Sequence, residues 1–259
     1  MKSNKWKFLL TGAATLTLLT ACTQASSQSA TKSNTAQTTA TSTSKNKTNN
    51  SNYFTDKDKD SSYDESKAST VKLSGSSASV SGDGVAVSGS TVTISKPGTY
   101  VISGESDGVQ IKVEAGDSDD VHIVLKGVTM TNTNAPISAT KAGHVYLTLA
   151  DGTTNTLSDS SSNNDEDADA VIFSKGDLTI NGSGALNIDA KKNNGIKAND
   201  TLHITGGTYK ITAVGDAFNV NDELNITGTT MTIDADEDAV KVDNDDDTSV
   251  GTMYLSDNK

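Results

Sequence analysis

Residues 194–211 read NGIKANDTLHITGGTYKI, and residues 216–233 read DAFNVNDELNITGTTMTI. The second stretch repeats the first after 22 residues and keeps the leucine at 202 and 224, the glycine at 206 and 228, and the isoleucines at 204 and 226 and at 211 and 233. The start of the motif returns once more as DAVK at residues 238–241. A repeat of this length, with short segments of alternating apolar and polar residues, is typical of a parallel β-solenoid. We therefore predict an all-β fold, a right-handed parallel β-helix of about 22 residues per turn.

Strand-like alternation begins near residue 68, before the clear repeats. Segments such as 92–94 and 109–113 alternate apolar and polar residues and are separated by glycine, serine, aspartate or the Pro97-Gly98 turn. We expect these first strands to form a β-rich cap on one domain that spans residues 68–259. No polar cap follows the last strand-like segment, so we expect this domain to be truncated at its C-terminus.

The first 21 residues have the pattern of a bacterial lipoprotein signal peptide. A basic start and an apolar run too short to span a bilayer are followed by LTAC at residues 19–22. This pattern predicts lipidation of Cys22, the only cysteine, and anchoring at the extracellular face of the cell membrane. A plain signal peptide with a chance cysteine, or an uncleaved membrane helix, is the alternative.

Residues 22–67 are predicted to be a disordered tether. Residues 23–52 are almost all Ser, Thr, Ala, Gln, Asn and Lys, which cannot bury enough apolar surface to fold. The DKDKD run at 56–60 resembles the start of a calcium loop, but Ser61 and Lys67 occupy the places where an EF-hand needs Gly and Glu. We therefore interpret residues 53–67 as solvated linker.

The charge balance excludes nucleic acid as a partner. The chain has 33 acidic and 21 basic residues, a net charge of −12, and every basic residue is lysine. Proteins that grip phosphate need clustered cations and usually arginine. Aspartate supplies 27 of the 33 acids, which suits a turn-rich fold and a short, stiff metal ligand.

An acidic or amide residue recurs at one position of the repeat, as Asn194, Asp216 and Asp238. Adjacent coils lie about 4.8 Å apart, so these side chains should stack. Facing carboxylates at that distance repel by about 3–4 kcal/mol at an effective dielectric of about 20. Calcium (Ca2+) between the coils would bind both carboxylates and remove this cost.

We therefore predict a calcium site along this column. Its predicted ligands are Asp169, Asn194, Asp216, Asp234, Asp236, Asp238 and Asp243. The alternative is a solvated acidic edge that discourages end-to-end stacking. The acidic run at residues 165–167 is a candidate for a second site.

Three further runs resemble a known family. They are VLKGVTMTN at 124–132, LADGTTNTL at 149–157 and FSKGDLTING at 173–182. Over about residues 70–255 the chain resembles the calcium-binding, β-helical carbohydrate-binding-domain lipoproteins first characterised from a cellulose-degrading clostridium. That family is similar in fold to the calcium-dependent family 9 pectate lyases, and it is described as binding cellulose-like and acidic, pectin-like polysaccharides.

The usual turn motif of that family is Asp-Gly-Ile-Lys, which this chain carries in part. Residues 194–197 read NGIK, residues 216–219 read DAFN, and residues 238–241 read DAVK. The resemblance therefore implies calcium binding at the second and third of these turns more than at the first.

These observations lead us to expect a surface lipoprotein that binds polysaccharide without catalysis. Exposed aromatic platforms are not expected, because the only tryptophan, Trp6, lies in the signal peptide. A calcium-dependent lyase is an alternative, in which Lys197 or Lys241 would act as the base, as a lysine does in the similar pectate lyases. A structural adhesin or spacer is a third possibility. The histidines at 122, 144 and 203 have no carboxylate partner identifiable from spacing, and the oligomeric state stays open.

Overall fold

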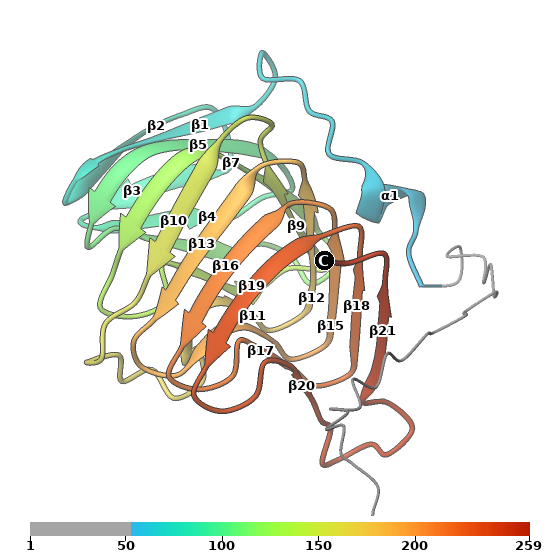
Figure 1. The fold of residues 1–259 in the computed structure, drawn as a ribbon. Coiled ribbons are helices and arrows are strands. Elements are labelled where there is room, and N and C mark those ends of the chain that lie inside the picture. The colour runs from blue at the N-terminus through green and yellow to red at the C-terminus, as the bar shows by residue number, and fades with distance from the viewer. Residues whose placement is uncertain (1–52) are drawn as a thin grey trace, which may run out of the picture. The chain divides into compact units, whose positions relative to one another are not determined.

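A computed structural model describes residues 53–259, which are nearly all β-structure arranged in two curled, mainly parallel sheets (Figure 1). The prediction of an all-β fold is confirmed. The predicted signal peptide, Cys22 and most of the predicted tether fall on residues 1–52, outside the described residues. Within residues 53–259 the one helix has four residues, and no helix there could cross a membrane.

The larger sheet has 13 strands and bends into two arms. The first arm consists of β10 (Thr154–Ser158), β13 (Ala185–Ala190), β16 (Thr208–Ala213) and β19 (Thr230–Ala235). The second arm consists of β9 (His144–Leu149), β12 (Asp177–Gly182), β15 (Thr201–Thr205), β18 (Glu223–Thr227) and β21 (Thr252–Ser256). The sheet also contains β7 (Asp120–Thr131), β5 (Gly98–Asp107), β1 (Ser69–Gly75) and β2 (Ser77–Ser81).

The smaller sheet has eight strands and closes the third side of the coil. In spatial order its strands are β20 (Lys241–Val242), β17 (Phe218–Val220), β14 (Asn194–Ala198), β11 (Ala170–Ser174), β8 (Ile137–Lys141), β6 (Gln110–Glu114), β4 (Thr91–Ile94) and β3 (Val85–Ser88). One full coil therefore contributes one strand to each arm and one to this sheet, as β15, β16 and β17 do.

The larger sheet bends at β7, which belongs to both arms. Residues 120–125 of β7 pair with β9, and residues 129–131 pair with β10. Gly127 lies at the corner between these two halves with a φ of 70°, a left-handed conformation that only glycine adopts without steric cost. The corner directs the two arms, and the residues on their outward sides, away from each other.

The parallel registers follow the sequence repeat. Thr201 pairs with Glu223 and Thr208 pairs with Thr230, each 22 residues further along the chain. Leu202 stacks on Leu224, and both are fully buried. Burying such a side chain contributes roughly 1.5–3 kcal/mol, so like-on-like apolar columns fix the register.

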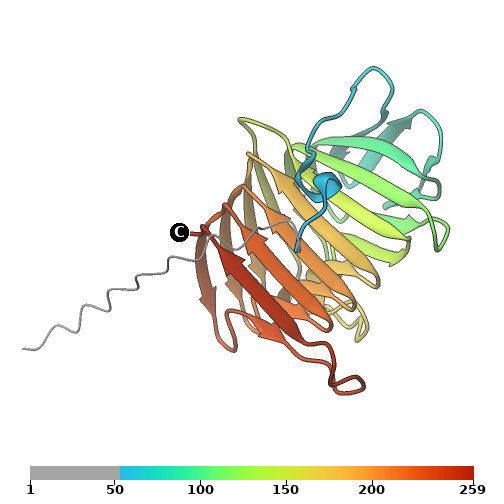
Figure 2. The ribbon, with the colours of Figure 1, turned by 90° about the vertical axis from the view of Figure 1, so that its right-hand side faces the viewer.

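Two hairpins begin the domain. Strands β1 and β2 pair antiparallel, and so do β3 and β4, whereas the later pairings are parallel. They lie at the N-terminal end of the coil, where the sequence indicated a β-rich cap (Figure 2).

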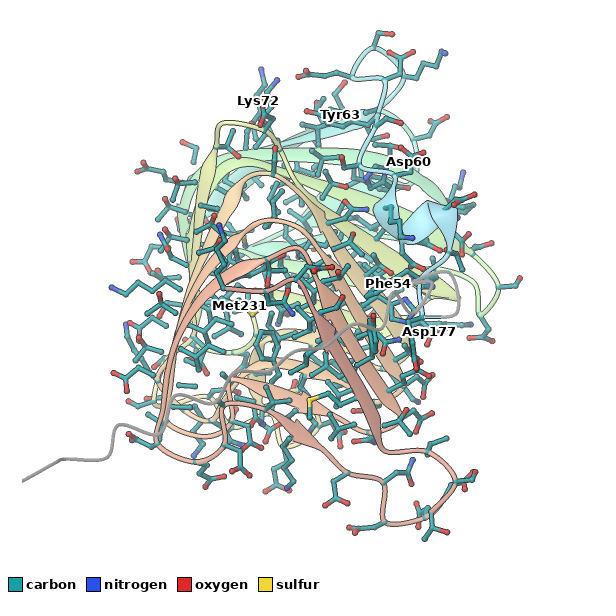
Figure 3. The ribbon with its side chains drawn as sticks, turned by 45° about the vertical axis from the view of Figure 1, so that its right-hand side comes forward. Phe54, Asp60, Tyr63, Lys72, Asp177 and Met231 are labelled. Carbon is teal, nitrogen blue, oxygen red and sulfur yellow. The ribbon has the colours of Figure 1, made fainter. Side chains whose placement is uncertain are left out.

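The prediction that residues 53–67 are solvated linker is wrong for their first half. Residues 53–60, which we call the strap, contain the helical turn α1 (Asp56–Lys59), and Figure 2 shows this turn lying against the sheet. The side chain of Thr55 and that of Asp58 form a capping box, which satisfies main-chain N–H groups at the start of the turn. Asp58 is 1% exposed, and its side chain accepts a hydrogen bond from Thr179 of the second arm. Phe54, labelled in Figure 3, is 5% exposed and packs against His203 of the same arm.

Candidate functional site

The predicted column exists, and main-chain groups link its members. Asn194, the first residue of β14, is 3% exposed, and Asp216, just before β17, is 2% exposed. The N–H of Asp216 donates to Asn194 Oδ1 at 3.1 Å, and the N–H of Asp238 donates to Asp216 Oδ1 at 3.0 Å. The side chains of Asn194 and Asp216 therefore each accept a hydrogen bond from the main chain of the next coil.

Hydrogen bonds also relieve the repulsion that we expected in this column. Asn219 Nδ2 donates to Asp216 Oδ2 at 2.6 Å, so both oxygens of this carboxylate have donors. The neighbour of Asp216 on one side is the neutral amide of Asn194, and Asp238 on the other side is exposed to solvent. These two hydrogen bonds satisfy both oxygens of the Asp216 carboxylate within the protein.

Asp169 joins the column at its N-terminal end. Lys197 Nζ donates to Asp169 Oδ1 at 2.7 Å, and Asn193 Nδ2 donates to Asp169 Oδ2. The side chains of Asp169 and Lys197 are 22% and 20% exposed, so this ion pair is partly buried. Asn194 Nδ2 approaches the main-chain oxygen of Asp169 at 3.5 Å.

A cavity of about 310 Å³ opens beside Asp169. We call it the acidic cleft, and its lining residues are Asn163, Asn164, Asp165, Glu166, Asp169, Lys192 and Asn193. Its donors and acceptors are carboxylates, amides and one ammonium group. The cleft therefore combines part of the predicted column with the acidic run at 165–167, which the sequence treated as a separate candidate.

The loop that forms one wall of the cleft is held in shape by its own side chains. Asp165 Oδ1 accepts the N–H of Ala168 at 3.1 Å, and Asn163 Oδ1 accepts the N–H of Asp165 at 3.0 Å. Beneath the loop, Asp159 is 2% exposed and accepts the N–H of Lys191 at 2.7 Å. Burial raises the pKa of Asp159 above its usual value, although these hydrogen bonds oppose the shift.

The structure does not gather the other predicted ligands at the cleft. Asp234, Asp236 and Asp243 are exposed in the last coil, where their main chains pair with the preceding coil. Asp234 pairs with Thr212 and lies on the outward side of the first arm. Between residues 53 and 259, no three His, Cys, Asp or Glu side chains are grouped closely enough to hold a metal ion.

Sequence reasoning missed a polar network on the outward side of the second arm. Asp58 Oδ2 lies 3.3 Å from His203 Nδ1, and Thr179 Oγ1 donates to Asp58 Oδ1 at 2.6 Å. Asp58 is therefore a carboxylate partner of His203 that the spacing in the sequence did not reveal. The Thr55-x-x-Asp58 pattern of a capping box was a usable signal for the helical turn, but not for its partners more than 100 residues away.

A second cavity, of about 270 Å³, lies between the strap and the sheet. Lys57 from the strap lies over the ring of Tyr146, with Nζ 4.4 Å from the ring centre, and forms an ion pair with Asp120. The ring of His144 stacks on Tyr146 at 4.0 Å. Burial and the nearby carboxylates of Asp120, Asp58 and Asp177 raise the pKa of Tyr146 to about 12, so this phenol is unsuited to act as a base near neutral pH.

Comparison with known proteins identifies the family to which the chain belongs. The model of a family described as carbohydrate-binding domain-containing proteins matches residues 88–259. The chain belongs to this family. A carbohydrate-binding domain-containing protein of Acetivibrio thermocellus is 39% identical over 126 residues, which cover 46% of this chain and 44% of that protein. The chain therefore matches less than half the length of this relative.

A solved structure supports the same assignment. The polysaccharide lyase-like protein from C. thermocellum, studied as a gadolinium derivative, is 34% identical with a TM-score of 0.70. The match covers 73% of this chain and 79% of that one. The resemblance to a clostridial carbohydrate-binding family is thus confirmed, and the curled parallel sheets are those of a polysaccharide lyase-like fold.

Proposed function

We propose that this protein binds polysaccharide without cleaving it, and that the acidic cleft holds acidic, pectin-like chains through calcium. The supporting observation is the cleft itself, a cavity of about 310 Å³ lined by three carboxylates and three amides in a member of a carbohydrate-binding family. The cleft is open to solvent, and a chain of uronic acids would present one carboxylate on each sugar ring.

The chemistry of the donors suits calcium. Calcium takes 6–8 oxygen ligands, and carboxylate or amide oxygens are among the commonest. Asp165 and Asp169 would hold the ion, with the amide oxygens of Asn163 and Asn193 and the carboxylates of the sugar chain as further ligands. When bound, the ion would supply a positive charge between these carboxylates and those of the sugar chain. The lyase-like relative carries gadolinium, a hard cation that also prefers oxygen ligands.

The column and the last coil supply further candidate ligands. Asp216 and Asn194 stabilise the turns behind the cleft through hydrogen bonds, so in our proposal they position Asp169 and its neighbours. Asp234, Asp236, Asp238 and Asp243 are exposed and remain candidates for a second, weaker calcium site.

Binding without catalysis is favoured by the state of Lys197. A lysine acts as a base only as a neutral amine, whereas the Lys197 ammonium is held by Asp169 at 2.7 Å. The likeness to a polysaccharide lyase-like protein keeps a lyase as the second candidate. Incubation with polygalacturonate and calcium separates the two, because elimination creates an unsaturated product that absorbs ultraviolet light and simple binding does not.

We also propose that the curled sheets form a right-handed parallel β-helix and that Cys22 anchors it to the extracellular face of the cell membrane. The 22-residue steps of the registers support the first proposal, and the signal-peptide pattern supports the second. Labelling with a radioactive fatty acid tests the anchor, since Cys22→Ser should abolish the label and release the protein from the membrane.

Retention on a polygalacturonate column tests the proposed function. We expect retention in calcium and release by a chelator, with a loss in Asp169→Asn and in Asp165→Asn. Asp117→Asn is the matched control, because Asp117 is 88% exposed and lies outside the cleft. Failure of the protein to bind any glycan would favour a structural spacer instead.

A further inference from the structure

A row of outward-facing side chains crosses the second arm beneath the strap. The registers align in it His122 of β7, Tyr146 of β9, Thr179 of β12, His203 of β15, Asn225 of β18 and Tyr254 of β21. Tyr53 at the start of the strap stacks on Tyr254 at 3.9 Å, and Tyr63 just after the strap contacts the ring of His122. Phe54, Asp60 and Tyr63, labelled in Figure 3, mark the course of the chain along this arm. The row is therefore a surface whose occupant belongs to the same chain.

Side chains of the sheet bind the main chain of the strap. Asn225 Nδ2 donates to the first main-chain oxygen of the strap at 3.1 Å, and Thr205 Oγ1 donates to that of Asp58 at 2.6 Å. Asn181 Nδ2 donates to the last main-chain oxygen of the strap at 3.1 Å. Every peptide carries such oxygens, so these three hydrogen bonds position a peptide without selecting its sequence.

Two side chains of the strap are bound more selectively. Asp58 Oδ1 accepts a hydrogen bond from Thr179 Oγ1 at 2.6 Å, and Asp58 Oδ2 lies 3.3 Å from His203 Nδ1. The ring of Phe54 meets that of His203 edge-on, with the ring centres 5.5 Å apart. Both Phe54 and Asp58 are buried by these contacts. The row therefore selects a peptide with an aromatic residue and, four residues later, an aspartate.

The segment that joins the strap to β1 is long enough to let the strap leave its own copy. Residues 62–67 are exposed, except for the half-buried Tyr63. Glu65 forms a surface ion pair with Lys126, and such pairs contribute little to stability. Residues 61–68, when extended, reach about 26–29 Å. A detached strap can therefore dock on a neighbouring copy, an exchange of identical elements that costs little free energy.

We propose that the outward side of the second arm is a peptide-binding site, and that the strap of a second copy of this chain fills it by exchange. The ligand is a short peptide with the aromatic residue and the aspartate of the strap. The acidic cleft shares no residue with this site, so the proposal does not depend on polysaccharide binding.

The docked strap sets a limit on the affinity of the site. A short linker gives the strap an effective concentration of about 1 mM at the site of its own copy. Because the docked state prevails at that concentration, a separate peptide of the same sequence binds with a dissociation constant below about 1 mM. In dilute solution each strap fills its own site, and exchange occurs where copies are crowded.

Titration of the whole Asp58→Ala protein with a fluorescent peptide of residues 53–60 tests the site. The strap of this variant is weakly held, so its site is accessible to the peptide. We expect saturable binding with a dissociation constant below about 1 mM. A peptide carrying Asp58→Ala should bind at least about tenfold more weakly, because it lacks the contacts to Thr179 and His203. A peptide carrying Asp56→Ala is the matched control and should bind as the natural sequence does, because Asp56 is exposed. No saturable binding, or equal binding of the Asp58→Ala peptide, would overturn the inference.

Sedimentation of mixed variants tests the exchange between copies. Thr179→Val/Thr205→Val keeps an intact strap but removes two donors from the site, whereas Asp58→Ala keeps the site and impairs the strap. Above the dissociation constant of the peptide, neither variant should associate with itself, but an equal mixture should form a heterodimer. Thr212→Val/Thr232→Val is the control, because these threonines are exposed on the first arm and its strap stays docked on its own copy. Equal melting temperatures show that the variants are folded, and a mixture that stays monomeric would overturn the exchange.

Discussion

Replacing Asp58 by alanine should weaken the docking of the strap on the second arm. The carboxylate is 1% exposed and accepts the N–H and Oγ1 of Thr55 at 2.7 and 2.8 Å, within the strap. Two contacts cross from it to the sheet, namely the hydrogen bond from Thr179 Oγ1 at 2.6 Å and the pairing with His203 Nδ1 at 3.3 Å. Within residues 53–259, these two contacts hold the Asp58 side chain to the sheet, and main-chain oxygens of the strap also accept hydrogen bonds from Asn181, Thr205 and Asn225.

The expected loss of docking free energy is about 3–6 kcal/mol. A hydrogen bond to a charged group contributes roughly 1.5–3 kcal/mol, and two such contacts join the Asp58 carboxylate to the sheet. One power of ten in an equilibrium constant corresponds to about 1.36 kcal/mol. The detached state of the strap should therefore become at least about a hundredfold more populated.

Hydrogen exchange of the main-chain amides in the strap measures this change. Asp58→Ala should lose protection at residues 53–60, while the buried strands keep theirs. Asp56→Ala is the matched control, because Asp56 lies in the same helical turn but is exposed. Unchanged protection of the strap in Asp58→Ala would refute the role given to this carboxylate.

The same carboxylate sets the pH range of docking. Burial alone would raise the pKa of Asp58, but hydrogen bonds from His203, Thr179 and Thr55 outweigh burial and hold the pKa far below the usual 3.8. Because the docked state binds this proton less tightly than the detached state, docking is fully stabilised above pH 3.8 and weakens below it. Strap protection that is already lost between pH 7 and 5 would contradict this assignment.

Three further outcomes follow from other buried polar groups. Tyr209→Phe should leave the free energy of unfolding in urea unchanged or raise it by about 1 kcal/mol, because the buried Tyr209 hydroxyl has no hydrogen-bond partner within residues 53–259. A loss of several kcal/mol would show that this hydroxyl does make a hydrogen bond. Asp216→Ala should lower the free energy of unfolding by about 2–3 kcal/mol in the presence of chelator, because it leaves the Asp238 N–H and the Asn219 amide without their acceptor. Asp216→Asn should lower it by less. A destabilisation that is seen only in calcium would show that the column is a metal site. Burial lowers the pKa of His122 and His144, so the unfolded chain takes up more protons than the folded chain below pH 6.5, and stability should fall from pH 7 to 5. His144→Gln should make this dependence of stability on pH less steep. An unchanged dependence would exclude His144 as its source.

The coil could be predicted from the sequence because the same packing contacts recur in successive repeats. Leu202 and Leu224 occupy equivalent positions of one repeat, and the pairing of β15 with β18 places them in contact. Apolar columns of this kind exist only if the register matches the repeat, so the 22-residue spacing determines which apolar side chains stack on each other. Tyr209 was likewise recognisable as core, because it shares its position with Met231.

The site could be predicted only in part. The stacking of Asn194, Asp216 and Asp238 follows from the repeat, but the main-chain N–H groups and the Asn219 amide that satisfy the column depend on local backbone geometry. The strap was missed for a different reason. Its composition is that of a linker, and the partners of Asp58 lie 121 and 145 residues away on the second arm, a distance that no local pattern spans.

Calorimetric titration of oligogalacturonate into the protein, with calcium and then with chelator, tests the proposed function most directly. We predict binding in calcium that disappears with chelator and weakens at least about tenfold in Asp169→Asn, with Asp117→Asn unchanged. Binding of equal strength in calcium and chelator, or in Asp169→Asn and the wild type, would contradict the assignment of the acidic cleft as a calcium-dependent polysaccharide site.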